Sequence, residues 1–387
     1  MNKKLLKNIL RLLSYILVAA VASCLTLFLF VPRTGMEKLV QLENLITQRF
    51  IGGAEQTQLL DGAAYGMVSA TGDRWSSYIP ASQYQNYLQT MNNQYVGIGV
   101  TISATITENG IEVLRLEENG GAKEAGILPG DFIYKVNGSL TSELGIDKAK
   151  QIIAGDVGTT VDITVLRAGQ TYDYTITRKE FSVTVAYGEM IGEDIGYVRI
   201  ENFDERCAQE TIAAIDAVLQ QGAKKLVFDV RNNPGGYKKE LVKVLDYLLP
   251  EGEVFHTVNY AGKEQIDRSD AACIDVPMAV LVNAQSYSAA EFFAAALHEY
   301  EKAVVVGEQT VGKGYFQETY KLLDGSAVSL SVGKYYTPKG INLVETGGLT
   351  PDVPVPVSDE IAAKIYAQLL SPEEDPQIAE AVAALTK

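Results

Sequence analysis

Two short stretches carry side chains suited to nucleophilic catalysis. One is Ser288-Ala289-Ala290-Glu291, and the other is Gly312-Lys313-Gly314, which Gln317 follows closely. The chain has only two histidines, His256 and His298, so a serine nucleophile has few histidine bases available to it. A lysine can take that role, because Ser-Lys pairs are an established variant of the Ser-His-Asp arrangement. The residue types therefore predict a serine nucleophile with a lysine base.

Ser288 stands between two expected elements. The apolar residues 279–282 predict a buried strand, and a helix is expected over 288–300. In α/β sheets ligands bind at the carboxyl ends of strands. A helix N-terminus offers free N–H groups and partial positive charge to a developing oxyanion. A purely structural role stays open, because Ser288 and Glu291 also have the spacing of a capping box.

Lys313 has neighbours that suit a base. Lysine has an ordinary pKa of ~10.4 and is a poor base at neutral pH, but apolar burial lowers that value. The glycines on both sides permit close approach. If the segment is a strand, Gln317 returns to the same face four residues later, and its amide could orient the amine. The alternative is a surface lysine in a glycine loop, with Gln317 an ordinary polar strand residue.

A third stretch follows another expected buried strand, over 225–230. It reads Asp229-Val230-Arg231-Asn232-Asn233-Pro234-Gly235-Gly236. A glycine turn at this point exposes backbone N–H groups at the sheet edge expected to hold Ser288, which makes Gly235-Gly236 a candidate oxyanion donor. The alternative is a plain turn before the helix expected over 238–249.

The remaining pattern predicts several domains. With 387 residues the chain has room for two or three. Residues 36–92 have the apolar spacing of helices. Residues 94–181 are strand-rich, with the alternation of a strand over 96–106 and a hairpin turn at Asn109-Gly110. From residue 182 strands and helices alternate, which predicts a mainly parallel sheet covered by helices. A hairpin over 315–336 is expected to make that sheet mixed.

The first 35 residues predict a membrane anchor. Four basic residues among the first eleven precede a largely apolar run over 12–31, and ~20 apolar residues suffice for a helix to cross a bilayer. The positive charge places the N-terminal end in the cytoplasm and the rest outside. A cleaved signal peptide and lipidation at Cys24 are the alternatives. The length of the run favours an uncleaved, single-pass anchor.

Charge and cysteine content exclude several kinds of partner. The formal net charge is −15, and the first 35 residues contribute five basic residues and no acidic ones, so the remainder carries −20. Such a surface argues against binding nucleic acid or anionic lipid. Cys207 and Cys273 are expected to be free thiols, although a disulfide between them stays open. No Cys/His cluster has metal-ligand spacing, so neither a metal nor another cofactor is predicted.

Taken together, the three stretches closely resemble the C-terminal processing, or tail-specific, peptidases. The match runs from about Leu59 to Asp352, and Lys313 lies 25 residues after Ser288, as in that family. The resemblance implies Ser288 as nucleophile, Lys313 as general base and Gln317 as its orienter. It also implies an oxyanion hole formed by the backbone of Ala289 and of Gly235-Gly236. The family's alternating Ser-Ala pattern is interrupted at Tyr287 and Ala290, which implies a change of pocket shape.

The strand-rich block resembles the family's PDZ domain. Tyr95-Val96-Gly97-Ile98-Gly99-Val100 matches the loop that binds a terminal carboxylate. Exposed N–H groups beside glycines can hold a carboxylate, and the following strand edge can pair with a peptide. A glycine-kinked strand without a ligand is the alternative. Arg167 ends a later strand, and the resemblance makes it a candidate for gating the protease; an exposed, solvated arginine is the alternative.

The expected fold class is therefore multidomain α+β. The expected parts are a cytoplasmic stub with a transmembrane helix (1–35), a helical region (36–92), a PDZ domain (93–181) and a crotonase-like α/β serine peptidase domain with a mixed sheet (182–387). The resemblance implies a membrane-anchored, extracytoplasmic serine endopeptidase. It would cleave polypeptides whose accessible C-termini the PDZ domain captures, without a cofactor.

The sequence is also compatible with other functions. A non-catalytic PDZ adaptor, in which Ser288 only caps a helix, is the main alternative. A non-peptidase hydrolase is disfavoured, since no phosphate loop or metal motif is present. The helical residues 39–67 could pair with a second copy to form a homodimer. A regulatory partner protein and the physiological substrate are not identifiable from the sequence.

Overall fold

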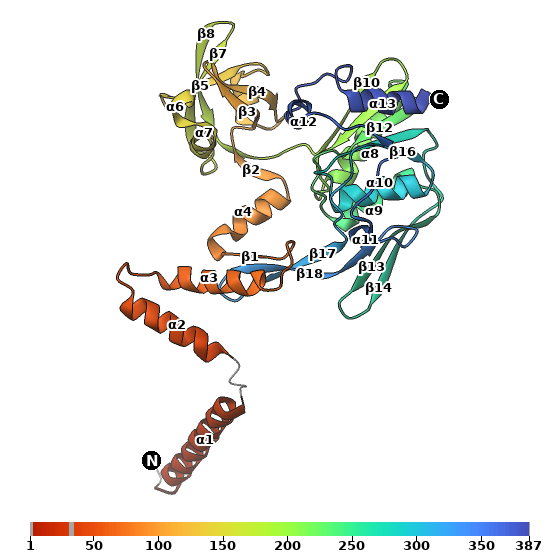
Figure 1. Cartoon of the computed structure of the whole chain (residues 1–387). Coiled ribbons are helices and arrows are strands. Elements are labelled where there is room, and N and C mark those ends of the chain that lie inside the picture. The colour runs from red at the N-terminus through yellow and green to blue at the C-terminus, as the bar shows by residue number, and fades with distance from the viewer. Residues whose placement is uncertain (1–2, 31–34, 387) are drawn as a thin grey trace. The chain divides into compact units, whose positions relative to one another are not determined.

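The computed structural model describes residues 3–30 and 35–386. The chain divides into two compact units, Met1–Tyr78 and Ile79–Lys387 (Figure 1). The helices of the first unit are α1 (Lys3–Phe30), α2 (Met36–Arg49) and α3 (Gln56–Ser69). The third helix of the expected helical region (36–92), α4 (Ala81–Met91), lies in the second unit.

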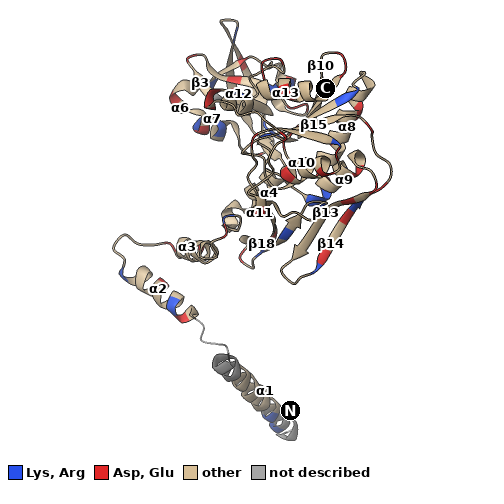
Figure 2. Ribbon diagram, turned by 45° about the vertical axis from the view of Figure 1, so that its right-hand side comes forward, with Lys and Arg blue, Asp and Glu red and all other residues tan. Residues whose placement is uncertain are grey.

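The first unit does not support the expected transmembrane anchor. Among the described residues, no helix combines the length and apolarity needed to cross a membrane. Residues 31–34 of the expected anchor lie outside the described residues. The described part of α1 shows basic residues near its N-terminal end (Figure 2).

An antiparallel sheet forms the middle of the chain. Its strand order is β3-β4-β5-β7-β8, so β3 is an edge strand. The bounds are β3 (Val100–Thr107), β4 (Gly110–Leu116), β5 (Phe132–Val136), β7 (Thr160–Arg167) and β8 (Gln170–Thr177). The short elements between them are α5 (Gly121–Ala125), β6 (Ser139–Leu140), α6 (Thr141–Leu144) and α7 (Ile146–Ile153). The predicted hairpin at Asn109-Gly110 is confirmed, since Thr107 pairs with Gly110.

The strand predicted over 96–106 is interrupted in the structure. The chain breaks at Ile98-Gly99 into β2 (Gln94–Gly97) and β3. Gly99 has φ +74°, and a Cβ there would lie 2.5 Å from Gly120 Cα, so only glycine fits this turn. β2 instead pairs with β9 (Lys179–Ser182), and the segments entering and leaving the antiparallel sheet therefore form one ribbon.

A second, larger sheet carries the C-terminal half. Its order is β10-β11-β12-β15-β16-β19. The bounds are β10 (Ala186–Ile191), β11 (Ile195–Ile200), β12 (Lys225–Asp229), β15 (Met278–Val282), β16 (Ala303–Gly307) and β19 (Val353–Pro354). Adjacent strands from β11 to β19 are parallel, and β10 is antiparallel to β11. We call this the central sheet.

The central sheet is mixed as predicted, but for a different reason. β10 supplies the antiparallel pair. The hairpin of β17 (Tyr315–Lys321) and β18 (Ala327–Tyr336) belongs to another sheet, in which β18 also pairs with β13 (Gly252–Asn259). β13 in turn pairs with β14 (Glu264–Ser269). The remaining elements are β1 (Ser77–Ile79), α11 (Leu343–Thr346) and α12 (Asp359–Tyr366).

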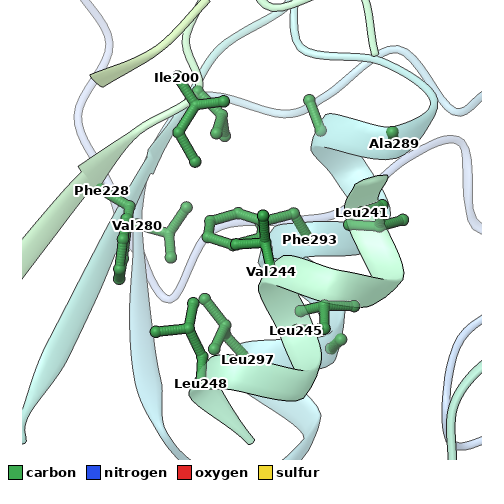
Figure 3. Packing of buried hydrophobic residues seen from close by; sticks show 14 of the residues in the cluster. Ile200, Phe228, Leu241, Val244, Leu245, Leu248, Val280, Ala289, Phe293 and Leu297 are labelled. Carbon is green, nitrogen blue, oxygen red and sulfur yellow. The ribbon is translucent and has the colours of Figure 1, made fainter. Parts of the chain in front are cut away.

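Helices cover both faces of the central sheet. On one face Phe228 and Val280 belong to a core with α8 (Cys207–Gln220), α9 (Lys238–Leu248) and α10 (Ala289–Glu299), as Figure 3 shows for Phe293 and Leu297 of α10. On the other face Val227 and Leu281 pack with α13 (Pro376–Thr386). Because neighbouring residues of a strand point to opposite faces, each buried strand needs apolar residues throughout, which explains its unbroken apolar sequence.

Candidate active site

Three loops meet at the carboxyl edge of the central sheet. They follow β12, β15 and β16, which are adjacent and parallel. The loops therefore begin side by side, although they are far apart in sequence. They contain the Gly235-Gly236 turn, Ser288 and Lys313 respectively, so the structure brings together the three predicted stretches.

Hydrogen bonds lock the first two loops to each other. Asn283 Nδ2 donates to Asn232 Oδ1, and the Asn232 N–H donates to Asn283 Oδ1, both at 2.9 Å. The Ser286 hydroxyl donates to the Val230 carbonyl at 2.7 Å. The Tyr287 N–H donates to the Asn233 carbonyl at 3.1 Å. The backbone before Ser288 is thus fixed against the glycine loop.

Ser288 has an unusual backbone. Its φ is 58° and its ψ −127°, a strained combination for a residue with a Cβ. An ordinary N-cap residue lies in the β region, so capping alone does not require this conformation. A sharp, strained strand-to-helix turn is the arrangement that presents a nucleophilic serine in the nucleophile elbow of α/β-hydrolases. The geometry therefore favours a role for Ser288 beyond capping α10.

Gly235 lies directly against the serine. A Cβ at Gly235 would be 2.7 Å from Ser288 Cβ and 2.8 Å from the Ala289 nitrogen, and its φ is +88°. The Gly235 N–H itself donates to Asn233 Oδ1 at 2.8 Å. The expected oxyanion donors are therefore reduced to the N–H groups of Gly236 and Ala289. Gly235 contributes by having no side chain.

The Glu291 carboxylate joins the serine helix to the lysine loop. Its Oε2 accepts the N–H groups of Ser288 and Lys313, each at 2.9 Å. Its Oε1 accepts the Thr310 hydroxyl at 2.5 Å and the Gly312 N–H at 2.7 Å. Burial raises the pKa of Glu291, while these four hydrogen bonds act in the opposite direction. One buried group thereby fixes the backbone of both predicted catalytic residues.

The glycines beside Lys313 make close contacts. Gly312 has φ +81°, and a Cβ there would lie 2.8 Å from the Gly348 nitrogen. A Cβ at Gly314 would lie 2.5 Å from Asn342 Oδ1, and Asn342 Nδ2 donates to the Gly314 carbonyl at 3.0 Å. Larger residues would displace the loop at either position.

The surroundings of the lysine amine differ from those expected. Lys313 is half-buried, and its Nζ lies 5.9 Å from the ring centroid of Tyr287. An aromatic face at this distance attracts a cation, so the site is not lined only by small, uncharged groups. Tyr287, one of the two departures from the family pattern, is thus part of the lysine's environment.

The expected role of Gln317 assumed that Lys313 and Gln317 lie in one regular strand, which is not the case. Lys313 precedes β17, and the register of β17 shifts between Phe316 and Gln317, so spacing alone does not place the two residues on one face. Gln317 Nε2 donates to Ser331 Oγ at 2.9 Å and to the Tyr315 carbonyl at 3.2 Å. Its role as orienter of the lysine stays a prediction.

Tyr335 is a site residue that the sequence analysis missed. Burial raises the pKa of its phenol to about 12, and a hydrogen bond with the Ser288 side chain acts in the opposite direction. Its N–H donates to the Gly314 carbonyl at 2.9 Å, and its ring stacks on Phe316 with centroids 5.5 Å apart. A buried tyrosine on a strand gives no signal of such a role in the sequence.

The six residues of the predicted carboxylate loop line one groove. Its volume is about 440 Å³. The lining residues are Tyr95, Val96, Gly97, Ile98, Gly99, Val100, Thr101, Ile102, Lys150, Ile153, Ala154, Phe181 and Val183. The groove therefore lies where β2, β3, α7 and the ribbon of β2 and β9 meet, as expected for a peptide-binding groove beside an edge strand.

Comparisons with known proteins identify the family. Residues 194–355 match the model of peptidase family S41, residues 112–167 a PDZ domain model and residues 26–82 the model of the activating protease CtpB N-terminal domain. The carboxy-terminal processing protease CtpA of Bacillus subtilis is 33% identical over 372 residues, which cover 92% of this chain and 79% of that protein. The chain belongs to peptidase family S41.

Other similar proteins agree with this assignment. The carboxyl-terminal-processing protease of Synechocystis is 31% identical over 80% of this chain and 73% of its own length. The solved structure of a photosystem II D1 C-terminal processing protease has a TM-score of 0.50 and 25% identity, covering 83% of this chain and 88% of that one. The chain is thus a serine-type peptidase of the carboxyl-terminal processing proteases.

Arg167 is bound within the PDZ domain of this S41 peptidase. Its Nε and Nη2 donate to the Asp131 carboxylate at 2.6 and 2.7 Å, and Nη2 also donates to the Gly126 carbonyl at 3.0 Å. These hydrogen bonds hold the Arg167 guanidinium against Asp131 and Gly126 within the domain. The gating role stays a prediction.

Among the residues that the structure describes, no group of three or more His, Cys, Asp or Glu side chains could hold a metal ion. Cys207 and Cys273 are both free thiols, and Cys207 is buried while Cys273 is half-buried.

A buried charge network supports the glycine loop of the peptidase domain. Asp229 at the end of β12 accepts bonds from Arg231 (Nη2, 2.6 Å), Arg199 (Nη1, 3.2 Å) and the Tyr197 hydroxyl (2.7 Å). Arg231 Nη1 also pairs with Asp375 at 2.8 Å, which ties the segment before α13 to this edge. Burial alone would raise the pKa of the Asp229 carboxyl, but the two arginines and Tyr197 hold it well below its usual range.

Asp229→Asn tests the pH dependence of this network. The substitution takes a buried carboxylate partner from both arginines, although Arg231 keeps Asp375 and Arg199 keeps Glu201. We therefore expect the free energy of unfolding at pH 7 to fall by about 3 kcal/mol. Because the folded-state pKa of Asp229 is depressed, its contribution is present above the ordinary carboxyl pKa and is lost as pH falls through the folded value. The difference measured by urea unfolding should therefore shrink between pH 7 and pH 3.

The control is Asp275→Asn, which removes an exposed carboxylate paired with Lys302; we expect no measurable change. An equal stability difference for Asp229→Asn at both pH values would contradict the assignment.

Gly235→Ala tests the contact with the serine. The new Cβ would collide with Ser288 Cβ and the Ala289 nitrogen, so we expect peptide cleavage to fall by about 100-fold, comparable to losing an oxyanion donor. Gly222→Ala is the matched control, because Gly222 also has a positive φ, +109°, but nothing lies within 4 Å of its Cβ position. Both variants bear a similar backbone strain. Equal kcat values for the two would show that the contact is irrelevant to catalysis.

Proposed function

We propose that this chain is a serine endopeptidase with a Ser288-Lys313 dyad, and that its PDZ domain recruits polypeptides by their C-terminal tails. The main support for the dyad is that the Glu291 carboxylate accepts hydrogen bonds from the backbone N–H groups of both residues, each at 2.9 Å. The strained backbone of Ser288 adds to it.

The reaction follows acyl-transfer chemistry. The Ser288 hydroxyl attacks the scissile carbonyl carbon, and the neutral amine of Lys313 accepts the hydroxyl proton. The N–H groups of Gly236 and Ala289 stabilise the oxyanion of the tetrahedral intermediate. The intermediate collapses to an acyl-enzyme when the lysine returns the proton to the leaving amine. Water then attacks the ester, and Lys313 again acts as base.

Tail recruitment rests on the groove of the PDZ domain. β3 pairs with β4 on one side only, so its other edge offers main-chain groups to an added strand. The glycine loop Gly97-Ile98-Gly99 precedes that edge and suits a terminal carboxylate. An unfolded tail bound there would be held on the same chain as the catalytic edge.

Location and assembly are further parts of the proposal. The basic residues before the apolar run 12–31 follow the sequence pattern of a cytoplasmic stub, so we place the peptidase domain outside the cytoplasm. This placement rests on the sequence pattern, since no described helix has the length and apolarity of a membrane span. α2 and α3 bury no side chain completely, and they carry exposed apolar residues such as Leu45 and Leu60. Such faces support pairing with a second copy. No regulatory partner is assigned.

Substitution of the dyad tests the function. We expect Ser288→Ala and Lys313→Ala each to reduce cleavage of an unfolded protein by at least about 1000-fold, because nucleophile and base act as a unit. Fragments are followed by mass spectrometry, with Lys339→Ala, an exposed lysine, as the active control. A fluorophosphonate probe should label Ser288 in the wild type and in Lys339→Ala, and should not label Ser288→Ala.

Two outcomes would contradict the proposal. Substantial cleavage by either purified dyad variant would remove the assigned residue from the mechanism. Absence of both cleavage and probe labelling in the wild type, with tail binding retained, would indicate a PDZ adaptor instead.

A further inference from the structure

The two ends of the PDZ groove can be told apart by their neighbours in the structure. Arg178, just before β9, donates from Nε to the Ile153 carbonyl at 2.9 Å and from Nη2 to the Ile152 carbonyl at 2.8 Å. The C-terminal end of α7 is thereby fixed to the chain beside the β2–β9 ribbon. Ile153 consequently lies at the end of the groove that holds the glycine loop, and Lys150 lies one turn further away from it.

This difference between the ends of the groove places the side chains of a bound tail. With its carboxylate at Gly97-Ile98-Gly99, the tail runs antiparallel to β3, and its terminal side chain lies near the buried, apolar Ile98 and Ile153. Alternate residues of a strand face the same side, so the side chain two positions before the C-terminus also faces α7. Two residues of strand span about 6.6 Å, and one turn of α7 from Ile153 to Lys150 spans about 4.5 Å.

Lys150 is the single charged residue among the groove-lining residues that the structure describes. Its side chain is exposed, and it takes part in none of the ion pairs formed among the described residues. The chain outside its first 35 residues carries a net charge of −20, so the charge of Lys150 is opposite in sign to the net charge of the chain. The flexible four-carbon stem lets the ammonium reach the side chain two positions before the tail's end.

We propose that Lys150 makes this groove selective for C-terminal tails that carry Asp or Glu two residues before an apolar terminal residue. This inference rests on the proposed recruitment of tails by the PDZ domain and names the class of tail. The ion pair is solvent-exposed and therefore sets preference among tails, while main-chain pairing with β3 supplies most of the affinity.

The test measures binding of matched peptides to the full chain carrying Ser288→Ala, which prevents cleavage. Four fluorescent decapeptides share one sequence with an apolar C-terminal residue. Three of them have Glu, Gln or Lys two positions before it, and the fourth is the Glu peptide with an amidated C-terminus. By fluorescence anisotropy we expect the Kd to rise about two- to fivefold from Glu to Gln, and again from Gln to Lys, as for an exposed ion pair.

Charge reversal sharpens the test. Lys150→Glu should invert the order, so that the Lys peptide binds most tightly. Lys148→Glu is the matched control, because Lys148 is an exposed lysine of the same helix that does not line the groove; it should leave the order unchanged. Raising the salt to about 1 M should reduce the preference, since the Debye length falls to about 3 Å.

The outcomes distinguish a failure of the proposed role of Lys150 from a failure of tail recruitment by the PDZ domain. If the three free-acid peptides bind equally while amidation abolishes binding, tail recruitment stands and the role of Lys150 is refuted. If amidation has no effect, or no peptide binds, tail recruitment itself fails and the inference falls with it. If Lys148→Glu inverts the order of the peptide affinities as Lys150→Glu does, the preference comes from the overall charge of α7, and the specific role of Lys150 is refuted.

Discussion

The buried carboxylate of Glu291 is the interaction on which the active site depends. It accepts four hydrogen bonds, from Ser288, Thr310, Gly312 and Lys313. Each parallel strand delivers its loop to the same sheet edge, but strand order alone positions a loop only coarsely. Catalysis needs a nucleophile and a base held in one geometry, and Glu291 supplies that constraint by joining the first turn of α10 to the loop after β16. The proposed Ser288-Lys313 chemistry therefore depends on two backbone segments that one side chain holds together.

The glycine turn connects this edge to the PDZ domain. The Phe203 N–H donates to the Gly235 carbonyl at 2.9 Å, and Tyr237, which follows the turn, donates its hydroxyl to Asn92 Oδ1 at 3.0 Å. Asn93 donates to Asp204 at 3.1 Å. The segment that leads into the PDZ domain thus binds the same short loop that supports the predicted oxyanion donors. Hydrogen bonds thus connect the segment before the PDZ domain to the loops that carry Asp204 and the glycine turn.

The sequence predicted the central sheet well, since buried parallel strands need unbroken apolar runs and their loops must meet at one edge. It missed β14, whose sequence is largely polar, and it assigned the β17–β18 hairpin to the wrong sheet, because pairing between distant strands leaves little local signal. At the site, residue type predicted Ser288 and Lys313, and the structure brings the loops that carry them to one edge of the sheet. The bond of the Gly235 N–H to Asn233, the contact of Tyr335 with Ser288 and the register shift before Gln317 could not be predicted, because each depends on side-chain packing or register.

The most direct test of the role of Glu291 is the rate at which a fluorophosphonate probe labels Ser288 in the wild type and in Glu291→Gln. An amide keeps the shape but places an NH₂ group opposite N–H donors, so we predict at least about 100-fold slower labelling with an unchanged circular dichroism spectrum. Glu301→Gln, an exposed carboxylate shortly after the same helix, should label at the wild-type rate. Labelling of Glu291→Gln at the wild-type rate would contradict the claim that this carboxylate holds the nucleophile and the lysine loop in their reactive geometry.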